Sequence, residues 1–230
     1  MRRRSRRIFA AALTALSLPM VPLAVHAKAL TVCTEASPEG FDVVRYNSLT
    51  TTNASADPVF NRLVEFDAAQ RKVVPSLATQ WSVSPDGLTY TFTLRPNVSF
   101  HSNSLFKPTR AFNANDVVFT FERMLDDKAP WHKLTPSGFP HAQSLSLGKL
   151  IKSVQKVDDH TVRFTLSEPD AVFLSMLSMG FASIYSAEYA DKLIAINKPG
   201  EMNARPIGTG PFVFCSYQKD SVVRYDANKS

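Results

Sequence analysis

The chain has 230 residues, with 26 lysine and arginine against 20 aspartate and glutamate side chains, and a formal net charge of +6. Five of these arginines lie in the first seven residues, and removing them from the 26 leaves 21, so the rest of the chain has no global electrostatic footprint for nucleic acid. A hydrophobic content of 44% excludes a disordered chain, and two cysteines exclude a small disulfide-rich domain.

Residues 1–27 have the three parts of a secretory signal peptide. The arginines precede an uncharged apolar run from Ile8 to Leu18, and Val25 and Ala27 provide small residues at the positions that a signal peptidase reads. The apolar run is too short to cross a bilayer, which needs about 20 residues. We therefore expect cleavage after Ala27 and export of the mature chain to the periplasm.

Beyond the signal peptide, the pattern predicts helices between antiparallel hairpins. Thr and large apolar residues alternate over 89–94, after a Pro85-Asp86-Gly87 turn, so this strand buries one face. Asn113 caps a helix that carries Asp116 in its first turn. In chain order the expected elements are a strand at 30–34, an ordered loop over 35–52, a helix over 56–63 capped by Asn53 or Ser55, strands at 81–83, 89–94 and 98–100, the helix to Leu125, strands at 153–157 and 161–166, a helix over 187–196 capped by Ser186, and strands at 212–217 and 222–225. This succession predicts an α+β fold.

Patterns that would indicate catalysis or metal binding are weak. The histidines at 101, 132, 141 and 160 never fall at metal-ligand spacing. Ser146 and Lys149 form a Ser-x-x-Lys match, which can mark an acyl-transfer nucleophile and its base, but the partner motifs of such enzymes do not follow it. Gly208 to Pro211 has no lysine after it and indicates a tight turn rather than a phosphate loop. The loop over 35–52 offers many neutral donors and acceptors, which suits recognition as well as a plain solvated connector.

Seven short segments, taken in their order and spacing, carry a resemblance to a known family. They are residues 35–42, 60–66, 77–87, 89–95 with Phe100-His101, 115–119, 156–159 and 206–212. Together they resemble the extracytoplasmic solute-binding proteins of ABC importers in the dipeptide and oligopeptide class, and the resemblance covers essentially the whole mature chain.

The resemblance implies a type II periplasmic binding protein fold, in which two lobes close around a ligand in a cleft. Residues 28–62 and 207–230 would belong to the first lobe, and residues 63–206 would form a smaller α+β domain attached to it. The family's chains continue into a second lobe that has no counterpart here, so the resemblance implies a truncated chain.

The implied function is capture of dipeptides or other short peptides for import, without catalysis and without a cofactor. The partners would be the peptide and the membrane permease subunits of the importer, the protein being a monomer. By position, Asn47, Ser48 and Thr50 would line one wall of the cleft, whereas the groups that pair with the peptide's charged ends lie on the second lobe in the family. Cys33 would match the family's N-terminal cysteine, whose disulfide partner lies beyond the chain end, or it would pair with Cys215.

Two other functions stay open. The cargo of the same family could be haem or another small solute. A more distant alternative is an exported serine acyl-enzyme that uses Ser146 and Lys149.

Overall fold

The computed structural model describes residues 29–229, and the chain divides into two compact units, Met1–Cys33 and Thr34–Ser230. The predicted signal peptide, with its cleavage site after Ala27, lies outside the described residues. In the first unit residues 29–33 form neither helix nor strand, so the strand expected at 30–34 is wrong. Leu30 and Val32 are exposed, and no described strand pairs with them to satisfy a ladder of backbone hydrogen bonds.

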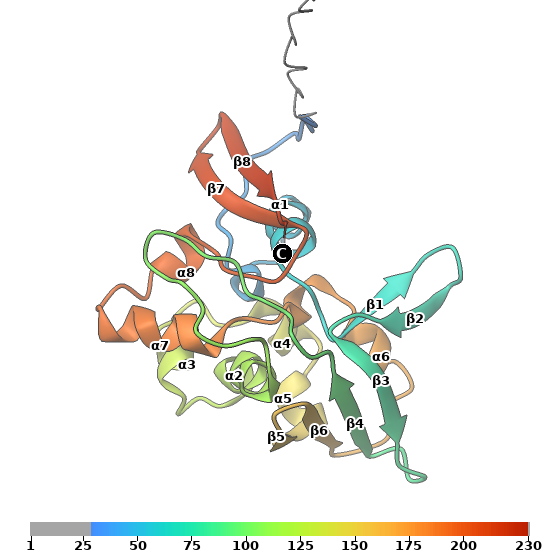
Figure 1. The fold of residues 1–230 in the computed structure, drawn as a ribbon. Coiled ribbons are helices and arrows are strands. Elements are labelled where there is room, and N and C mark those ends of the chain that lie inside the picture. Colours follow the sequence, from blue (N-terminus) through green and yellow to red (C-terminus); the bar gives the residue numbers. More distant parts are fainter. Residues whose placement is uncertain (1–28, 230) are drawn as a thin grey trace, which may run out of the picture. The chain divides into compact units, whose positions relative to one another are not determined.

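The second unit combines short helices with three antiparallel sheets (Figure 1), which confirms the mixed α and β class. Its elements are η1 (Val43–Arg45), α1 (Leu49–Val59), β1 (Val64–Asp67), β2 (Lys72–Pro75), β3 (Ala78–Val83), β4 (Thr89–Leu94), α2 (Ala114–Leu125), α3 (Pro130–Lys133), α4 (Pro140–Ser144), α5 (Leu147–Leu150), β5 (Ile151–Asp158), β6 (Thr161–Leu166), α6 (Phe173–Met176), η2 (Gly180–Ala182), α7 (Ala187–Ala195), α8 (Glu201–Ala204), β7 (Phe212–Gln218) and β8 (Val222–Ala227). Among residues 29–229, no helix has the length and apolar character that crossing a membrane requires.

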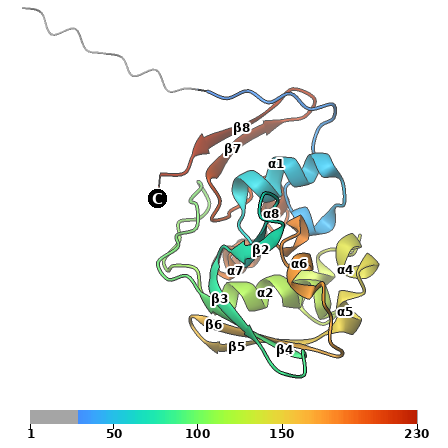
Figure 2. The ribbon, with the colours of Figure 1, turned by 90° about the vertical axis from the view of Figure 1, so that its right-hand side faces the viewer.

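The central sheet contains both hairpins that the alternation predicts, in the order β3-β4-β6-β5. The apolar residues of β4 and β6 are buried, and their threonines stay partly exposed on the other face. Helix α2 covers the buried face (Figure 2), where Phe121 meets the ring of Phe164 edge-on at 4.9 Å. The period-two pattern therefore identified both the strands and their buried side.

The start of α2 is the strongest capping site of the unit. Asn113 and Asp116 form a capping box, and the carboxylate of Asp116 also accepts hydrogen bonds from Arg110 at 2.7 and 2.8 Å. The same carboxylate accepts from the backbone N–H of Ala187, the first residue of α7, at 2.9 Å. One fully buried acid thus fixes the beginnings of two helices that are about 70 residues apart in the sequence.

Helix α1 differs from its prediction at both ends. It begins at Leu49 rather than at Ala56, because Ser48 is the cap and accepts from the N–H of Thr51, and it ends at Val59 rather than Leu63. The Thr and Ser residues within it satisfy their hydroxyls on carbonyls four residues back, as Thr52 does on Ser48 and Ser55 on Thr51. Its buried face, and not its helix propensity, holds this sequence in a helix.

The strands predicted at 212–217 and 222–225 are present as β7 and β8, and they pair with each other in a sheet of their own. Its inner face rests on the ring of Phe41, which lies 4.6 Å from Phe214 and 5.2 Å from Tyr217. The strand expected at 98–100 is absent from the described secondary structure, because this segment is an extended link that accepts only one bond, from Phe112 to Val98.

The turn at Gly208–Gly210 joins the hairpin to the rest of the unit, as expected of a tight turn. The N–H of Gly210 donates to the carbonyl of Val59 at 2.8 Å, and a Cβ on Gly208 would lie 2.0 Å from that same oxygen. His101 closes the turn from the other side: its N–H donates to Gly208 and its ring Nε2 to Gly210, both at 2.9 Å. Close backbone packing, and no phosphate chemistry, thus explains the glycines.

We expect Gly208→Ala to destabilise the protein, because its methyl group cannot fit against the Val59 carbonyl. The loss should be about 3 kcal/mol in the free energy of unfolding, as for strong overpacking. Gly148→Ala is the matched control, since nothing lies within 4 Å of its Cβ position and it sits in a helix. Urea denaturation would measure both; equal midpoints for the two variants would contradict the packing role.

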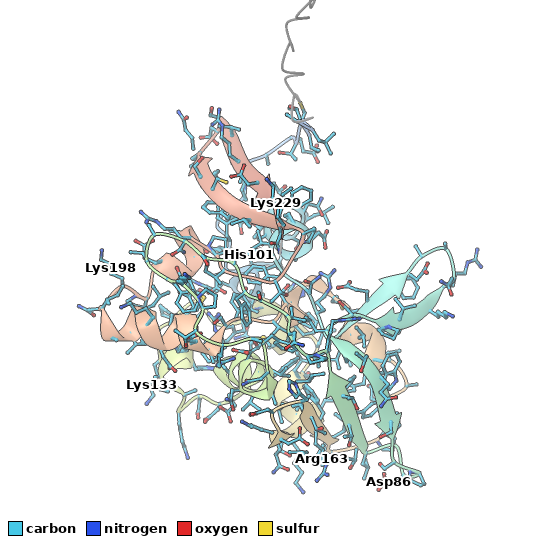
Figure 3. All side chains as sticks on the ribbon, in the orientation of Figure 1. Asp86, His101, Lys133, Arg163, Lys198 and Lys229 are labelled. Carbon is cyan, nitrogen blue, oxygen red and sulfur yellow. The ribbon has the colours of Figure 1, made fainter. Side chains whose placement is uncertain are left out.

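The buried ring of His101 (Figure 3) predicts a loss of stability in acid. Burial lowers the pKa of His101 despite the hydrogen bond to Gly210. The Nδ1 atom of His101 has no acceptor nearby, so an N–H formed there by protonation would have no hydrogen bond. Stability should therefore be complete above the ordinary histidine pKa of about 6.5 and should fall as the pH drops through the lowered folded-state pKa. His101→Gln should flatten the fall of the urea-denaturation midpoint below about pH 6.5, whereas His160→Gln, at an exposed turn, should not. Identical slopes for the wild type and His101→Gln would refute the assignment.

Candidate ligand-binding surface

The three residues expected to contact a ligand lie together at the N-terminus of α1. Asn47 is exposed, and Ser48 and Thr50 are half-buried. The hydroxyl oxygen of Ser48 accepts from the N–H of Thr51 at 3.3 Å, so Ser48 has a structural role that the sequence did not reveal. Its O–H proton, the amide of Asn47 and the hydroxyl of Thr50 remain a group of neutral donors and acceptors on one short segment.

Leu49, between these polar residues, is the functional candidate that the sequence reasoning missed. Its side chain is 73% exposed although it is large and apolar. The sequence shows only a single leucine within a run of polar residues. Because single exposed apolar side chains are common on protein surfaces, this pattern does not indicate a binding role. Together with Asn47, Ser48 and Thr50 it forms the candidate surface, which offers one apolar contact among polar ones.

A buried ion pair holds the segment that leads into this surface. Arg123 of α2 donates from both terminal nitrogens to Asp42, at 3.1 and 2.7 Å, and the side chains are only 1% and 2% exposed. Three rings surround the guanidinium, with its carbon 5.1 to 5.8 Å from their centroids, namely those of Tyr185, Trp131 and Phe139. Since η1 begins at the residue after Asp42, this pair places the backbone that continues to Asn47.

Asn203 of α8 anchors the same segment from a different direction. Its side-chain oxygen accepts from the N–H groups of Phe41 and Asp42, each at 3.0 Å. The chain can approach this closely because residue 40 is glycine; a Cβ there would lie 2.3 Å from that oxygen. The bond from the N–H of Glu39 to the hydroxyl of Thr51, at 3.0 Å, ties the segment to α1.

A hollow of the second unit lies elsewhere. It has a volume of about 760 Å³ and is bounded by the 39–41 segment, the 102–104 loop, residues 203–206 and strand β7. None of Asn47, Ser48 and Thr50 lines it. The candidate surface therefore lies outside this hollow.

The two cysteines and the Ser-x-x-Lys pair are exposed among the described residues. Cys33 and Cys215 are free and exposed, so a disulfide of Cys33 with Cys215 or with another cysteine stays a prediction. Ser146, the residue before α5, is in a left-handed conformation with φ of 52°, and it is exposed together with Lys149. Within residues 29–229 no hydrogen bond joins these two side chains, and no three His, Cys, Asp or Glu groups come together as a metal site would need.

Comparison with known proteins supports one family. Residues 72–230 match the sequence model of the bacterial extracellular solute-binding proteins, family 5 Middle. A probable di/tripeptide-binding protein 5 of Pseudomonas aeruginosa (strain UCBPP-PA14) is 63% identical over 94% of this chain and 42% of that protein. Heme-binding protein A of Haemophilus influenzae (strain ATCC 51907) is 47% identical over 86% of this chain and 36% of that protein.

A solved structure agrees with these sequence matches. The dipeptide-binding protein from Pseudoalteromonas sp. SM9913, in complex with Met-Leu, superposes with a TM-score of 0.83 and 38% identity over 85% of this chain and 39% of that one. The chain thus spans about two fifths of the length of the relatives that it matches. Its described fold is that of the matching part of a type II periplasmic binding protein, as the sequence resemblance implied.

We predict that Asp42→Asn loosens the segment that leads to the candidate surface. It leaves the Arg123 guanidinium buried without its counter-charge, which costs about 3–5 kcal/mol in the free energy of unfolding. Amide hydrogen exchange of residues 41–48 should also accelerate. Asp159→Asn, which breaks the exposed pair with Lys156, should leave both measurements at wild-type values. Unchanged exchange in Asp42→Asn would show that the pair does not position the segment.

Proposed function

Because this chain belongs to the bacterial extracellular solute-binding proteins of family 5, we propose that it serves to capture dipeptides and other short peptides in the periplasm for an ABC importer. The observation that carries the proposal is the 63% identity to a probable di/tripeptide-binding protein over nearly the whole chain. In this role the protein binds and releases its ligand without chemical change. Its partners are the peptide and the permease subunits of the importer, and it acts as a monomer.

The candidate surface suits the main chain of a short peptide. A peptide unit presents one N–H donor and one C=O acceptor, and the amide of Asn47 can both donate and accept. The Ser48 hydroxyl still has a proton to donate, because its oxygen is used as the helix cap. Leu49 adds an apolar contact for a ligand side chain. Such neutral contacts read the peptide backbone and leave the choice of side chains broad.

The wider architecture of the proposal follows the family resemblance. Residues 28–62 and 207–230 form one part of the first lobe, and residues 63–206 form the smaller domain attached to it. The bond from the N–H of Gly210 to the carbonyl of Val59 supports this grouping, because it joins residues 207–230 to residues 28–62. The matched part of the relatives is about two fifths of their length, so the opposite wall of their clefts lies outside it. We therefore expect residues 28–230 by themselves to bind peptides weakly.

Haem is the second candidate cargo, because one relative is named a heme-binding protein and is 47% identical. A protein commonly holds haem iron through a histidine, cysteine, methionine or tyrosine ligand. None of Asn47, Ser48, Leu49 and Thr50 can act in this way. His101 is buried and bonded to Gly210, so it does not offer its ring to a ligand. The chemistry of the candidate surface thus favours a peptide.

Nuclear magnetic resonance of residues 28–230 tests the proposal. Titration with Met-Leu should shift the backbone amide signals of residues 47–50, with a dissociation constant in the millimolar range. Asn47→Ala should weaken this binding at least about threefold, the loss expected for one hydrogen bond. Asn53→Ala, an exposed asparagine of the same helix, should leave it unchanged.

Two outcomes would contradict the peptide proposal. Peptide-induced shifts confined to residues outside 47–50 would move the site elsewhere. A saturable shift of the haem Soret band with no response to peptides would assign the cargo to haem.

A further inference from the structure

Arg45 is the charged residue nearest in sequence to the candidate surface. It is the last residue of η1 and lies two positions before Asn47. Between Asp42 and Asp57 the sequence contains no other charged side chain. The charge that accompanies the neutral donors and acceptors of residues 47–50 is therefore positive.

Arg45 differs from the other arginines that are at least partly buried within residues 29–229. Each of those pairs with a carboxylate, namely Arg62 with Glu65 at 2.6 Å, Arg110 with Asp116 at 2.7 Å and Arg123 with Asp42 at 2.7 Å. Arg45 is half-buried, yet its side chain makes no hydrogen bond or ion pair with the described residues. A guanidinium that has lost part of its hydration favours a carboxylate beside it, and the described part of the chain does not supply one.

The helices that pack on η1 explain why this charge stays without a partner. Neither α4 nor η2 contains an acid. Helix α1 has no acid in its first turn, and Asp57 in its last turn pairs with Arg62. Asp42, which precedes η1, accepts from Arg123 with both of its oxygens. Within the described residues, Arg45 is thus left open to an acceptor that a ligand brings.

The ring of Tyr46 keeps the guanidinium close to the candidate surface. The guanidinium carbon of Arg45 lies 5.9 Å from the centroid of this ring, and Tyr46 directly precedes Asn47. The Nε atom of Arg45 is enclosed, whereas its two terminal nitrogens are not among the enclosed atoms and have no acceptor within residues 29–229. These two nitrogens can form a parallel pair of hydrogen bonds with one carboxylate.

A short peptide can reach Arg45 and Asn47 at the same time. An extended chain covers at most about 3.6 Å per residue, so the Cα atoms of Arg45 and Asn47 are no more than about 7 Å apart. A dipeptide has the same reach. A peptide whose main chain contacts Asn47 and Ser48 can therefore place the carboxylate of one of its side chains beside the guanidinium.

We propose that Arg45 selects peptides that carry an aspartate or glutamate side chain. The side-chain carboxylate accepts hydrogen bonds from both terminal nitrogens of Arg45, while the main chain of the ligand contacts Asn47 and Ser48. This inference rests on the proposed peptide function and adds a preference that the neutral contacts alone do not provide. The C-terminus of a peptide has the same carboxylate chemistry, so the test separates these two sources.

Four peptides added to residues 28–230 test the proposal by nuclear magnetic resonance. Met-Glu and Met-Gln differ in the charge of one side chain, and Met-Leu and Met-Leu amide differ in the charge of the C-terminus. At low ionic strength the backbone amides of residues 44–50 should show that Met-Glu binds at least about threefold more tightly than Met-Gln, as for a partly exposed ion pair. Met-Leu and its amide should bind equally. In about 1 M salt, where the Debye length is about 3 Å, the preference for Met-Glu should disappear.

Three variants assign the preference to one side chain. Arg45→Gln should remove the difference between Met-Glu and Met-Gln. Arg45→Lys keeps the cation and should retain part of the difference, which separates recognition of charge from a change in the fold of η1. Arg163→Gln removes an exposed arginine of β6 (Figure 3) and should keep the wild-type difference.

The outcomes separate this inference from the proposed function. Equal binding of Met-Glu and Met-Gln by the wild type, or an unchanged difference in Arg45→Gln, would overturn the role of Arg45 and leave peptide binding at residues 47–50 intact. A preference for Met-Leu over its amide that Arg45→Gln removes would assign Arg45 to the peptide C-terminus and overturn the selection of acidic side chains. If residues 47–50 respond to none of the four peptides, the proposed function fails and this inference fails with it.

Discussion

Two opposite charges, Asp42 and Arg123, are withdrawn from water inside a ring of aromatic side chains, and the position of the candidate surface depends on them. Because both charges lose their hydration, such a pair adds little net stability. A fold that buried one of the two charges without the other would, however, be strongly destabilised. The pair therefore specifies where residues 41–48 lie against α2. Asn203 also fixes the orientation of this segment, because its side-chain oxygen accepts hydrogen bonds from two successive backbone N–H groups.

A charged side chain also fixes the N-terminal end of α2. Asp116 caps this helix, pairs with Arg110 and accepts from the first N–H of α7, so a single carboxylate orients two helices. Both ends of α2 are thus bound to segments distant in sequence through charged groups, while its apolar face packs on β5 and β6. This arrangement explains how a unit with mostly very short helices keeps a defined geometry.

Sequence patterns predicted what local physics controls and missed what distant contacts control. The alternation in residues 89–94 and 161–166 revealed the hairpins, because a half-buried strand requires period two. Helix α1 was misplaced, since its Thr and Ser residues read as loop and only burial against η1, η2 and β7 makes them helical. The polar composition of the 35–52 loop suited recognition, but only the family resemblance singled out Asn47, Ser48 and Thr50 within it. Asp42 and Arg123, 81 residues apart, left no local signal of their pairing.

The glycines of the Pro206–Phe212 segment are among the residues that make the family recognisable, and the structure shows what they report. Gly208 and Gly210 are needed because the carbonyl of Val59 leaves no room for a side chain. These glycines report that two stretches of backbone cross closely, and this constraint does not depend on the ligand. A motif of this kind therefore identifies the fold of a sequence and carries no information about its ligand. Under the proposed function, cargo can change through the exposed side chains around Leu49 while the glycines of this segment stay as they are.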